Sequence, residues 1–279
     1  MNLLKINYII LLKFLGNIID IIYPRNKKKI FIFHEISKKN HKKFYKVIQY
    51  IKSKYEIIDP NDDFKFENLK KNQAIITFDD GYYSQYECAK KYLDKQNIKA
   101  IFFIIYEFMK IKTKKNHREF LKKNLLIKKN QLEKKEFKNM NFNNLKLLVK
   151  KGHLIGAHTL NHPNLTQLDK NNCKKEILHC KYKITKKIGV KNITNFAITF
   201  GGIKFINPYI LKICKQYYKS TFTGIRGSNN DNKNIFFREN CDLNKDFSEI
   251  KFAIDGYADL HYFFDRITLK IYNYFSKKC

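Results

Sequence analysis

The stretch AIITFDDGYYSQY, residues 74–86, passes from an apolar run to two adjacent carboxylates and then to a helical pattern. Residues 74–78 are apolar or β-branched, which is typical of a buried strand. Asp79 and Asp80 follow directly, and Gly81 comes after them. Two unscreened carboxylates at the edge of a core repel each other, and a bound divalent cation removes that cost. The stretch therefore predicts a strand that carries two acidic side chains to a site at its carboxyl end.

The alternation of strand and helix patterns continues on both sides of this stretch. β-rich runs occur at 29–36, 99–105, 153–158, 195–200, 220–224 and 235–240, and helical spacing occurs at 42–55, 83–97, 141–152, 169–189 and 207–218. Continuously apolar strands are typical of a parallel sheet that is covered on both faces. We therefore expect one α/β domain over residues 28–279 with a barrel or barrel-like sheet. The Lys-rich stretch 107–139 is expected to form a helical insertion or a long loop.

The residues before this domain, 1–27, predict an amphipathic helix. At 100° per residue the polar side chains gather on one side, and Leu, Ile and Phe cover the wide remainder. Pro24 ends the helix and the basic cluster RNKKK, 25–29, follows it. This pattern is typical of a helix that lies in the plane of a membrane surface, and a helix packed on the domain is the alternative. The longest apolar run, 8–12, is too short to span a bilayer, and no cleavage site of small residues follows it.

The composition bears on partners and location. With 44% hydrophobic and 15% aromatic residues the chain can build a full core. The formal net charge of +31 comes mainly from Lys spread along the chain. Nucleic-acid-binding proteins commonly use Arg, which binds bases and phosphates with two hydrogen bonds. A charge that comes mainly from dispersed Lys therefore favours a peripheral membrane contact and no nucleic acid partner. The six cysteines form no C-x-x-C pair, which predicts reduced, buried thiols. We therefore expect a cytoplasmic protein that is associated with the inner face of the membrane.

Ionisable residues stand where three of the expected strands end. His34 follows the first strand, Asp79 and Asp80 follow the second, and His158 follows a later one, with His162 four residues further on. The loops after the carboxyl ends of parallel strands share one face, so these side chains should converge. Alone, a D-D-G sequence such as 79–81 is often only a turn, and an H-x-x-x-H sequence such as 158–162 is often only a pair of surface or core histidines. Together, one carboxylate and two imidazoles form a ligand set that suits a catalytic zinc or another borderline divalent metal.

At these residues the sequence resembles the polysaccharide deacetylase family, the NodB homology domain of carbohydrate esterase family 4. TFDDG, 77–81, matches the first motif of the family, and HTLNH, 158–162, matches the second, H-[ST]-x-x-H. FAITFGG, 196–202, stands where the third motif is expected. The resemblance covers roughly residues 28 to 260. It implies a distorted (β/α) barrel and a metal-dependent hydrolase of the cell envelope. Such an enzyme removes N-acetyl groups from an amino sugar in a polysaccharide or a lipid-linked glycan.

The resemblance also implies roles for the matching residues. Asp79 would be the general base, and Asp80, His158 and His162 would hold the divalent metal. Zn²⁺ is the first choice for that metal, with Co²⁺, Ni²⁺ and Mn²⁺ as alternatives. The implied substrate partner is an N-acetylated glycan.

The third motif departs from the family pattern. The family's arginine, which orients the base, would fall on Ala197, and its proline would fall on Thr199. Arg238 ends another expected strand and is our substitute partner for Asp79, with a surface arginine as the alternative. A backbone N–H of this motif, that of Phe200 beside Gly201, would hold the oxyanion.

The general acid stays open between two histidines. His261 is the nearest match to the family's late motif, but its surroundings predict a helix. His34, at the end of the first strand, is better placed by geometry. The other histidines, His41, His117, His153 and His179, are expected to be structural or exposed. The alternative to an enzyme is a catalytically silent glycan-binding protein with the same fold.

Overall fold

In the computed structural model the described residues are 27–60, 71–134, 137–230 and 234–277. The N-terminal helix expected within residues 1–27 lies outside them, apart from Lys27.

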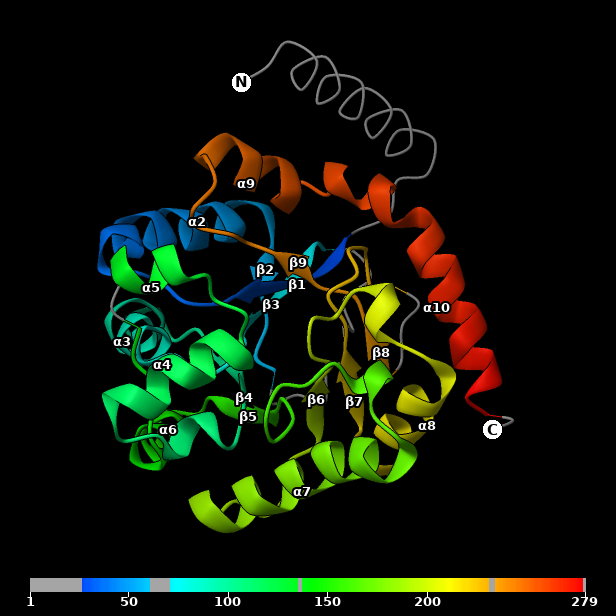
Figure 1. The fold of residues 1–279 in the computed structure, drawn as a ribbon. Helices are drawn as coiled ribbons and strands as arrows, with labels where there is room; N and C mark the ends of the chain where they lie inside the picture. Colours follow the sequence, from blue (N-terminus) through cyan, green and yellow to red (C-terminus); the bar gives the residue numbers. More distant parts are fainter. Residues whose placement is uncertain (1–26, 61–70, 135–136, 231–233, 278–279) are drawn as a thin grey trace.

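The centre of the described fold is a sheet of nine strands in which every pair is parallel (Figure 1). The strand order is β8-β7-β6-β5-β4-β3-β1-β9, and the short β2 pairs with the start of β3. The strands are β1 (Lys28–Phe33), β2 (Glu56–Ile57), β3 (Gln73–Phe78), β4 (Ala100–Ile104), β5 (Leu154–Ala157), β6 (Asn195–Ala197), β7 (Ser220–Phe222), β8 (Ile235–Phe236) and β9 (Glu239–Asn240). The parallel sheet with helices around it confirms the predicted distorted barrel.

The helices cover the outside of this sheet (Figure 1). They are α2 (His41–Lys54), α3 (Tyr83–Cys88), α4 (Lys114–Lys123), α5 (Lys129–Lys134), α6 (Phe142–Lys150), α7 (Lys170–Ile188), α8 (Pro208–Tyr217), α9 (Phe247–Ile254) and α10 (Phe263–Phe275), with the 3₁₀ helix η7 (Tyr257–Tyr262) between the last two. Their ends follow local sequence signals. The Asp169 side chain caps α7 by accepting from the N–H of Asn172, and Gly189 ends it with φ 76°. None of the described helices is both long and apolar enough to cross a bilayer.

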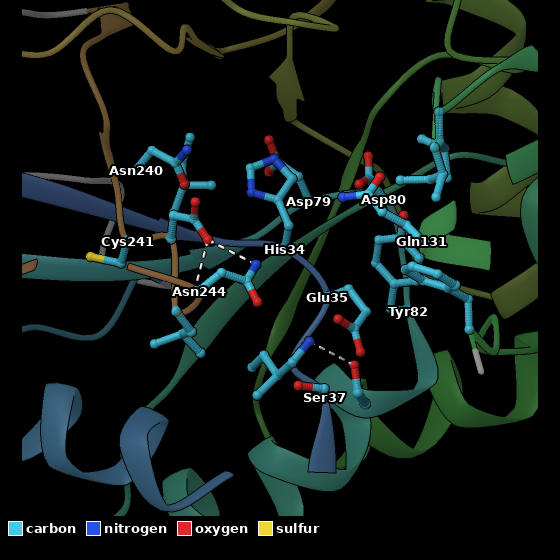
Figure 2. A pocket seen from close by; sticks show the side chains of 18 of the residues that line it. His34, Glu35, Ser37, Asp79, Asp80, Tyr82, Gln131, Asn240, Cys241 and Asn244 are labelled. Atoms are coloured by element: carbon cyan, nitrogen blue, oxygen red, sulfur yellow. Dashed lines mark hydrogen bonds between the residues drawn. The ribbon is translucent and has the colours of Figure 1, made fainter. Parts of the chain in front are cut away.

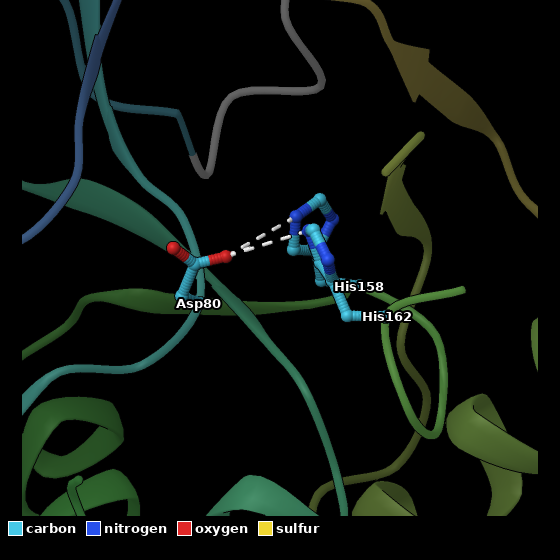
Figure 3. A group of neighbouring side chains, drawn as sticks. All are labelled: Asp80, His158 and His162. Carbon is cyan, nitrogen blue, oxygen red and sulfur yellow. Dashed lines mark ion pairs between the residues drawn. The ribbon is translucent and has the colours of Figure 1, made fainter. Parts of the chain in front are cut away.

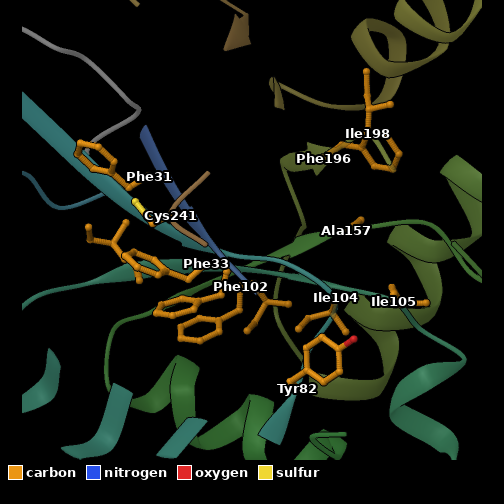
Figure 4. Close-up of a cluster of buried hydrophobic side chains, with 14 of the residues drawn as sticks. Phe31, Phe33, Tyr82, Phe102, Ile104, Ile105, Ala157, Phe196, Ile198 and Cys241 are labelled. Atoms are coloured by element: carbon orange, nitrogen blue, oxygen red, sulfur yellow. The ribbon is translucent and has the colours of Figure 1, made fainter. Parts of the chain in front are cut away.

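Two apolar layers hold the sheet. Alternate side chains of the strands point to opposite faces, so neighbours such as Ile75 and Ile76 belong to different clusters. The inner cluster fills the barrel and consists of Ile30, Ile75, Ile101, Phe103, Ala197, Phe222 and Phe236. The larger outer cluster lies between the sheet and the helices, and Figure 4 shows part of it. Its Phe78 and Phe102 rings stack at 4.7 Å between centroids.

The segment 235–241 joins the two ends of the sheet. Phe236 accepts a hydrogen bond from the N–H of Thr223 (2.9 Å) on one side, and the N–H of Cys241 donates to the carbonyl of Ile32 (2.9 Å) on the other. Between these contacts the N–H of Arg238 donates to the carbonyl of Ile225 (3.0 Å). We predicted one strand over 235–240, and it divides into β8 and β9 because the segment changes its partner from β7 to β1.

Part of the basic cluster RNKKK lies within β1 and is buried. The Lys28 and Lys29 side chains are inside the fold, so they are not available at a membrane surface. The Lys28 ammonium donates to the side chain of Gln73 (2.9 Å), and that of Lys29 pairs with Asp259 (2.6 Å). These two residues of RNKKK therefore do not contribute to a basic cluster at a membrane surface.

The cysteines agree with their prediction. Those in the described residues, Cys88, Cys173, Cys180, Cys214 and Cys241, are free and buried.

Candidate active site

A cavity of about 1100 Å³ opens where the strands end (Figure 2). Its walls come from the segments that follow β1, β3, β5, β6 and β9 and from the Lys-rich insertion. Figure 2 shows the His34, Asp79 and Asp80 side chains together at this cavity. The carboxyl ends of the parallel strands thus supply most of the site, as such folds generally do.

Three buried ligand atoms face one another in the cavity (Figure 3). Asp80 Oδ1 lies 3.6 Å from His158 Nε2 and 3.7 Å from His162 Nε2. These distances are too long for hydrogen bonds, but they suit ligands around one ion. Two ligands that each stand about 2.1 Å from a tetrahedral ion are separated by about 3.4 Å. The three side chains therefore fit a divalent metal, with coordination positions left for water or substrate.

Backbone carbonyls orient both imidazoles. His158 Nδ1–H donates to the carbonyl of Ala197 (2.8 Å), and His162 Nδ1–H donates to that of Asn124 (3.0 Å). Because a carbonyl only accepts, the proton of each neutral ring is on Nδ1. The lone pair of each Nε2 is then directed toward Asp80. Metal-binding histidines are generally held in this way.

Burial favours the neutral form of one of these rings. Burial and the neighbouring His158 lower the pKa of His162 to about 4, despite the opposing effect of Asp80. The ring is therefore neutral at physiological pH, which is the form that binds a metal.

The HTLNH turn is held from α7. The Glu176 carboxylate accepts hydrogen bonds from the N–H groups of Leu160 (2.9 Å) and Asn161 (3.0 Å). Thr159 and His162 have positive φ angles of 66° and 61°, which non-glycine residues seldom adopt. Such strain persists only where surrounding contacts impose it, and it is commonly found at functional sites.

Asp79 forms a buried, two-pronged ion pair with Arg238. The two guanidinium nitrogens donate to its two carboxylate oxygens at 2.7 and 2.8 Å, and the side chains are only 4% and 1% exposed. Burial alone would raise the pKa of Asp79, but the charge and hydrogen bonds of Arg238 outweigh it and hold the pKa at about 2. Asp79 is therefore ionised throughout the physiological range.

Arg238 is fixed on its other sides as well. Its Nε–H donates to the carbonyl of Thr223 (2.8 Å), and its guanidinium lies over the Phe103 ring at 5.1 Å and near that of Phe222 at 5.9 Å. Ala197 belongs to the same inner cluster as these two rings. The structure thus places Arg238 where the missing arginine of the third motif would be needed, and it is not a surface residue.

The third motif forms one edge of the cavity. Phe200 and Gly201 both line it and have positive φ angles of 60° and 61°. A Cβ on Gly201 would stand 2.4 Å from the nitrogen of Gly224, so only glycine fits there. Within the described chain the N–H groups of Phe200 and Gly201 have no hydrogen-bond acceptor. The Phe200 ring packs on that of His162 at 4.7 Å between centroids.

The structure separates the two candidates for the general acid. His34 lines the cavity and is close enough to help lower the pKa of Asp79. His261 is not among the cavity residues. It lies in η7, whose Asp259 pairs with Lys29 at the beginning of β1, away from the carboxyl ends of the strands. The structure therefore brings His34 to the site and does not bring His261 there.

The structure also locates one of the histidines that we expected to be structural. His153 is buried, and its Nδ1 accepts a hydrogen bond from the N–H of Ala100 (3.1 Å). Its Nε2 lies 2.9 Å from a carboxylate oxygen of Asp94.

The Lys-rich insertion contributes more to the site than the sequence indicated. Leu125, Ile127 and Gln131 line the cavity. Asn124 orients His162 through its carbonyl, and its side-chain amide donates to the carbonyl of Asn161 (2.7 Å). These contacts join residues far apart in the sequence, so no local pattern reveals them.

The family model for polysaccharide deacetylases matches residues 67–219 of this chain. The match spans more than half of the 279 residues, and the chain belongs to the polysaccharide deacetylase family. Membership in this family supports deacetylase activity on a carbohydrate. No curated protein matches the chain.

Solved structures of deacetylases share the fold. The Streptococcus pyogenes deacetylase PplD, solved in complex with acetate, is 19% identical with a TM-score of 0.62, and the match covers 82% of this chain and 99% of that one. IcaB from Ammonifex degensii is 16% identical with a TM-score of 0.63, over 84% of this chain and 97% of that one. A de-N-acetylase from Aggregatibacter actinomycetemcomitans is 14% identical with a TM-score of 0.60, over 81% and 99%.

Proposed function

We propose that the protein is a metal-dependent deacetylase that hydrolyses the N-acetyl group of an amino sugar in a polysaccharide or a lipid-linked glycan. The observation that carries this proposal is the combination of two sets of residues in one cavity. Asp80, His158 and His162 present three buried metal ligands, and the ionised Asp79 stands next to them, held by Arg238. His158 Nε2 lies 3.9 Å from Asp79 Oδ2, so the base and the ligands are adjacent.

Each residue then has a definite task in amide hydrolysis. A divalent cation held by Asp80 and the two histidines would polarise the acetyl carbonyl and make water more acidic. Asp79 accepts the proton of the attacking water while Arg238 keeps the carboxylate ionised and aimed. The new C–O bond turns the carbonyl oxygen into an oxyanion.

The remaining steps use the other edges of the cavity. The N–H groups of Phe200 and Gly201 are the donors that we assign to the oxyanion. His34 donates a proton to the amine nitrogen as the C–N bond breaks. The products are acetate and the free amino sugar.

Acetate release from N-acetylglucosamine oligomers tests this proposal. The chelated protein should be inactive, and Zn²⁺, or failing that Co²⁺, Ni²⁺ or Mn²⁺, should restore activity. Asp79→Asn should lower kcat by about 100-fold or more while the metal content stays at that of the parent. His153→Gln is the matched control, because that histidine is buried outside the cavity. If the metal-loaded protein released no acetate from a broad panel of N-acetylated glycans, a silent glycan-binding protein would be favoured instead.

We also propose that the enzyme acts in the cytoplasm at the inner face of the membrane, on a lipid-linked or nascent glycan. The free, buried thiols support a reducing compartment. Cell fractionation that finds the protein in the periplasm or the medium would contradict this placement.

A further inference from the structure

Helix α10 exposes a large apolar surface that the rest of the described chain does not cover. Among the described residues, eleven large hydrophobic side chains are exposed, and six of them belong to this one helix. These six, which we call the α10 face, are Phe263, Phe264, Ile267, Ile271, Tyr274 and Phe275, with exposed fractions from 41 to 77%. At 100° per residue they occupy a single arc of about 120°. Only Leu269, on the other side, is a buried apolar residue of the helix.

The α10 face is not explained by the deacetylase site. None of its residues lines the cavity. Soluble monomers seldom expose a continuous apolar patch of this kind, and such patches usually mark a contact with a protein or a membrane. Four of the six side chains are aromatic, and aromatic rings are favoured at the boundary between lipid and water.

The surroundings of the α10 face suit a lipid surface. Lys270 and Lys277 are exposed beside the apolar arc, where they can reach lipid headgroups. The first described residue lies near the elements that precede this helix, because Lys27 Nζ donates to the carbonyl of Asp255 (3.1 Å), between α9 and η7. Figure 1 shows α10 along one side of the molecule, following directly on α9 and η7.

We propose that the α10 face is a membrane-binding surface that lies in the headgroup region of an anionic bilayer. The charge of the protein favours this occupant over a second copy, since two chains of net charge +31 repel each other and anionic lipids attract them. The N-terminal segment alone is also a poorer occupant. Its predicted apolar face is so wide that packing it on α10 would still leave apolar surface in water.

The chain contains no tryptophan, which allows a direct test in the full-length protein. Phe264→Trp introduces a single tryptophan at the most exposed position of the α10 face, at 77% exposure. We expect its emission to move to shorter wavelength when vesicles of phosphatidylcholine and phosphatidylglycerol are added, and to be quenched by brominated lipids. Tyr182→Trp in α7, at a position that is 57% exposed, is the control and should show neither effect.

Each other outcome overturns the proposal. An emission that stays unchanged with vesicles, whether or not the protein sediments with them, means that the α10 face does not enter the bilayer. An emission that is already shifted without lipid means that protein covers the face. If this lipid-independent shift in emission depends on protein concentration, a second copy covers the face. If it does not depend on concentration, the chain's own N-terminal segment covers the face.

A second measurement gives the contribution of the α10 face. Phe264→Ser with Ile271→Ser should lower the partition constant for the anionic vesicles by about tenfold or more, since both side chains lose apolar area that lipid would bury. The control pair Leu147→Ser with Tyr182→Ser removes exposed apolar residues from α6 and α7 and should leave partitioning unchanged. Acetate release from a soluble oligomer should be the same for both pairs. Equal partitioning by the two pairs would refute the proposal.

Discussion

Removing the guanidinium of Arg238 tests whether its ion pair with Asp79 stabilises the site and holds the Asp79 carboxylate in place. Arg238→Met keeps an unbranched side chain and deletes the charge. Both partners are almost completely buried and hydrogen-bonded at 2.7 and 2.8 Å, so water cannot replace the lost contact. Removing one partner of a buried ion pair costs about 3–5 kcal/mol, because the other charge is left alone in a medium that solvates it poorly. We expect this loss in the free energy of unfolding of the metal-free protein, measured with urea.

A double variant separates the charge effect from packing. In Asp79→Asn with Arg238→Met both charges of this pair are removed, so neither is left buried without the other. We therefore expect the double variant to be more stable than the sum of the two single losses predicts, by at least about 1 kcal/mol. If the loss of stability in the double variant equals the sum of the two single losses to within about 0.5 kcal/mol, Asp79 and Arg238 do not stabilise each other. The pair then does not hold Asp79 in place, and our interpretation of the site is wrong. Arg238→Lys keeps the charge but not the forked geometry, and should lower kcat about tenfold or more with KM little changed.

Three further predictions concern the metal, the third motif and the general acid. His158→Ala should reduce bound metal from about one equivalent to near zero in elemental analysis, and chelation of the parent protein should abolish acetate release reversibly. Gly201→Ala should destabilise the protein to urea by several kcal/mol, whereas Gly189→Ala, with a similar φ but open space around it, should cost only about 1 kcal/mol. His34→Gln should lower kcat by about 100-fold at unchanged metal content, and His261→Gln should leave it unaltered; the opposite result would exchange their roles.

Most of the strands could be predicted from the sequence because they are short, apolar runs with a clear end, whereas the two-residue β2 was not predicted. The predicted strand at 74–78 is Gln73–Phe78 in the structure, and the one at 99–105 is Ala100–Ile104. The helix expected at 83–97 is less regular, since its α-helical turns end at Cys88 and give way to π and 3₁₀ turns. The change of partner within 235–240 could not be read from the sequence, because pairing with β7 or β1 depends on the closure of the whole sheet.

For the candidate site, too, one part could be predicted from the sequence and another could not. Asp79, Asp80 and the two histidines of HTLNH could be selected because strand ends carry them to a common face. The contacts that orient them could not be predicted, because the carbonyl of Asn124 and the carboxylate of Glu176 come from segments distant in sequence. Every residue has a backbone carbonyl, so the residue type at position 124 does not reveal this role.

The relation between Ala197 and Arg238 leads to one more prediction. β6 contributes to the site through the carbonyl of Ala197, which orients His158, while the guanidinium comes from the segment that joins the ends of the sheet. In Arg238→Ala the space over the Phe103 and Phe222 rings is vacated, and Ala197 borders the same cluster. Adding Ala197→Arg to that variant should therefore recover at least about tenfold of the lost kcat/KM, because a second guanidinium can reach Asp79. If the double variant is folded by circular dichroism and no more active than Arg238→Ala, the two positions are not interchangeable and the guanidinium acts only from position 238.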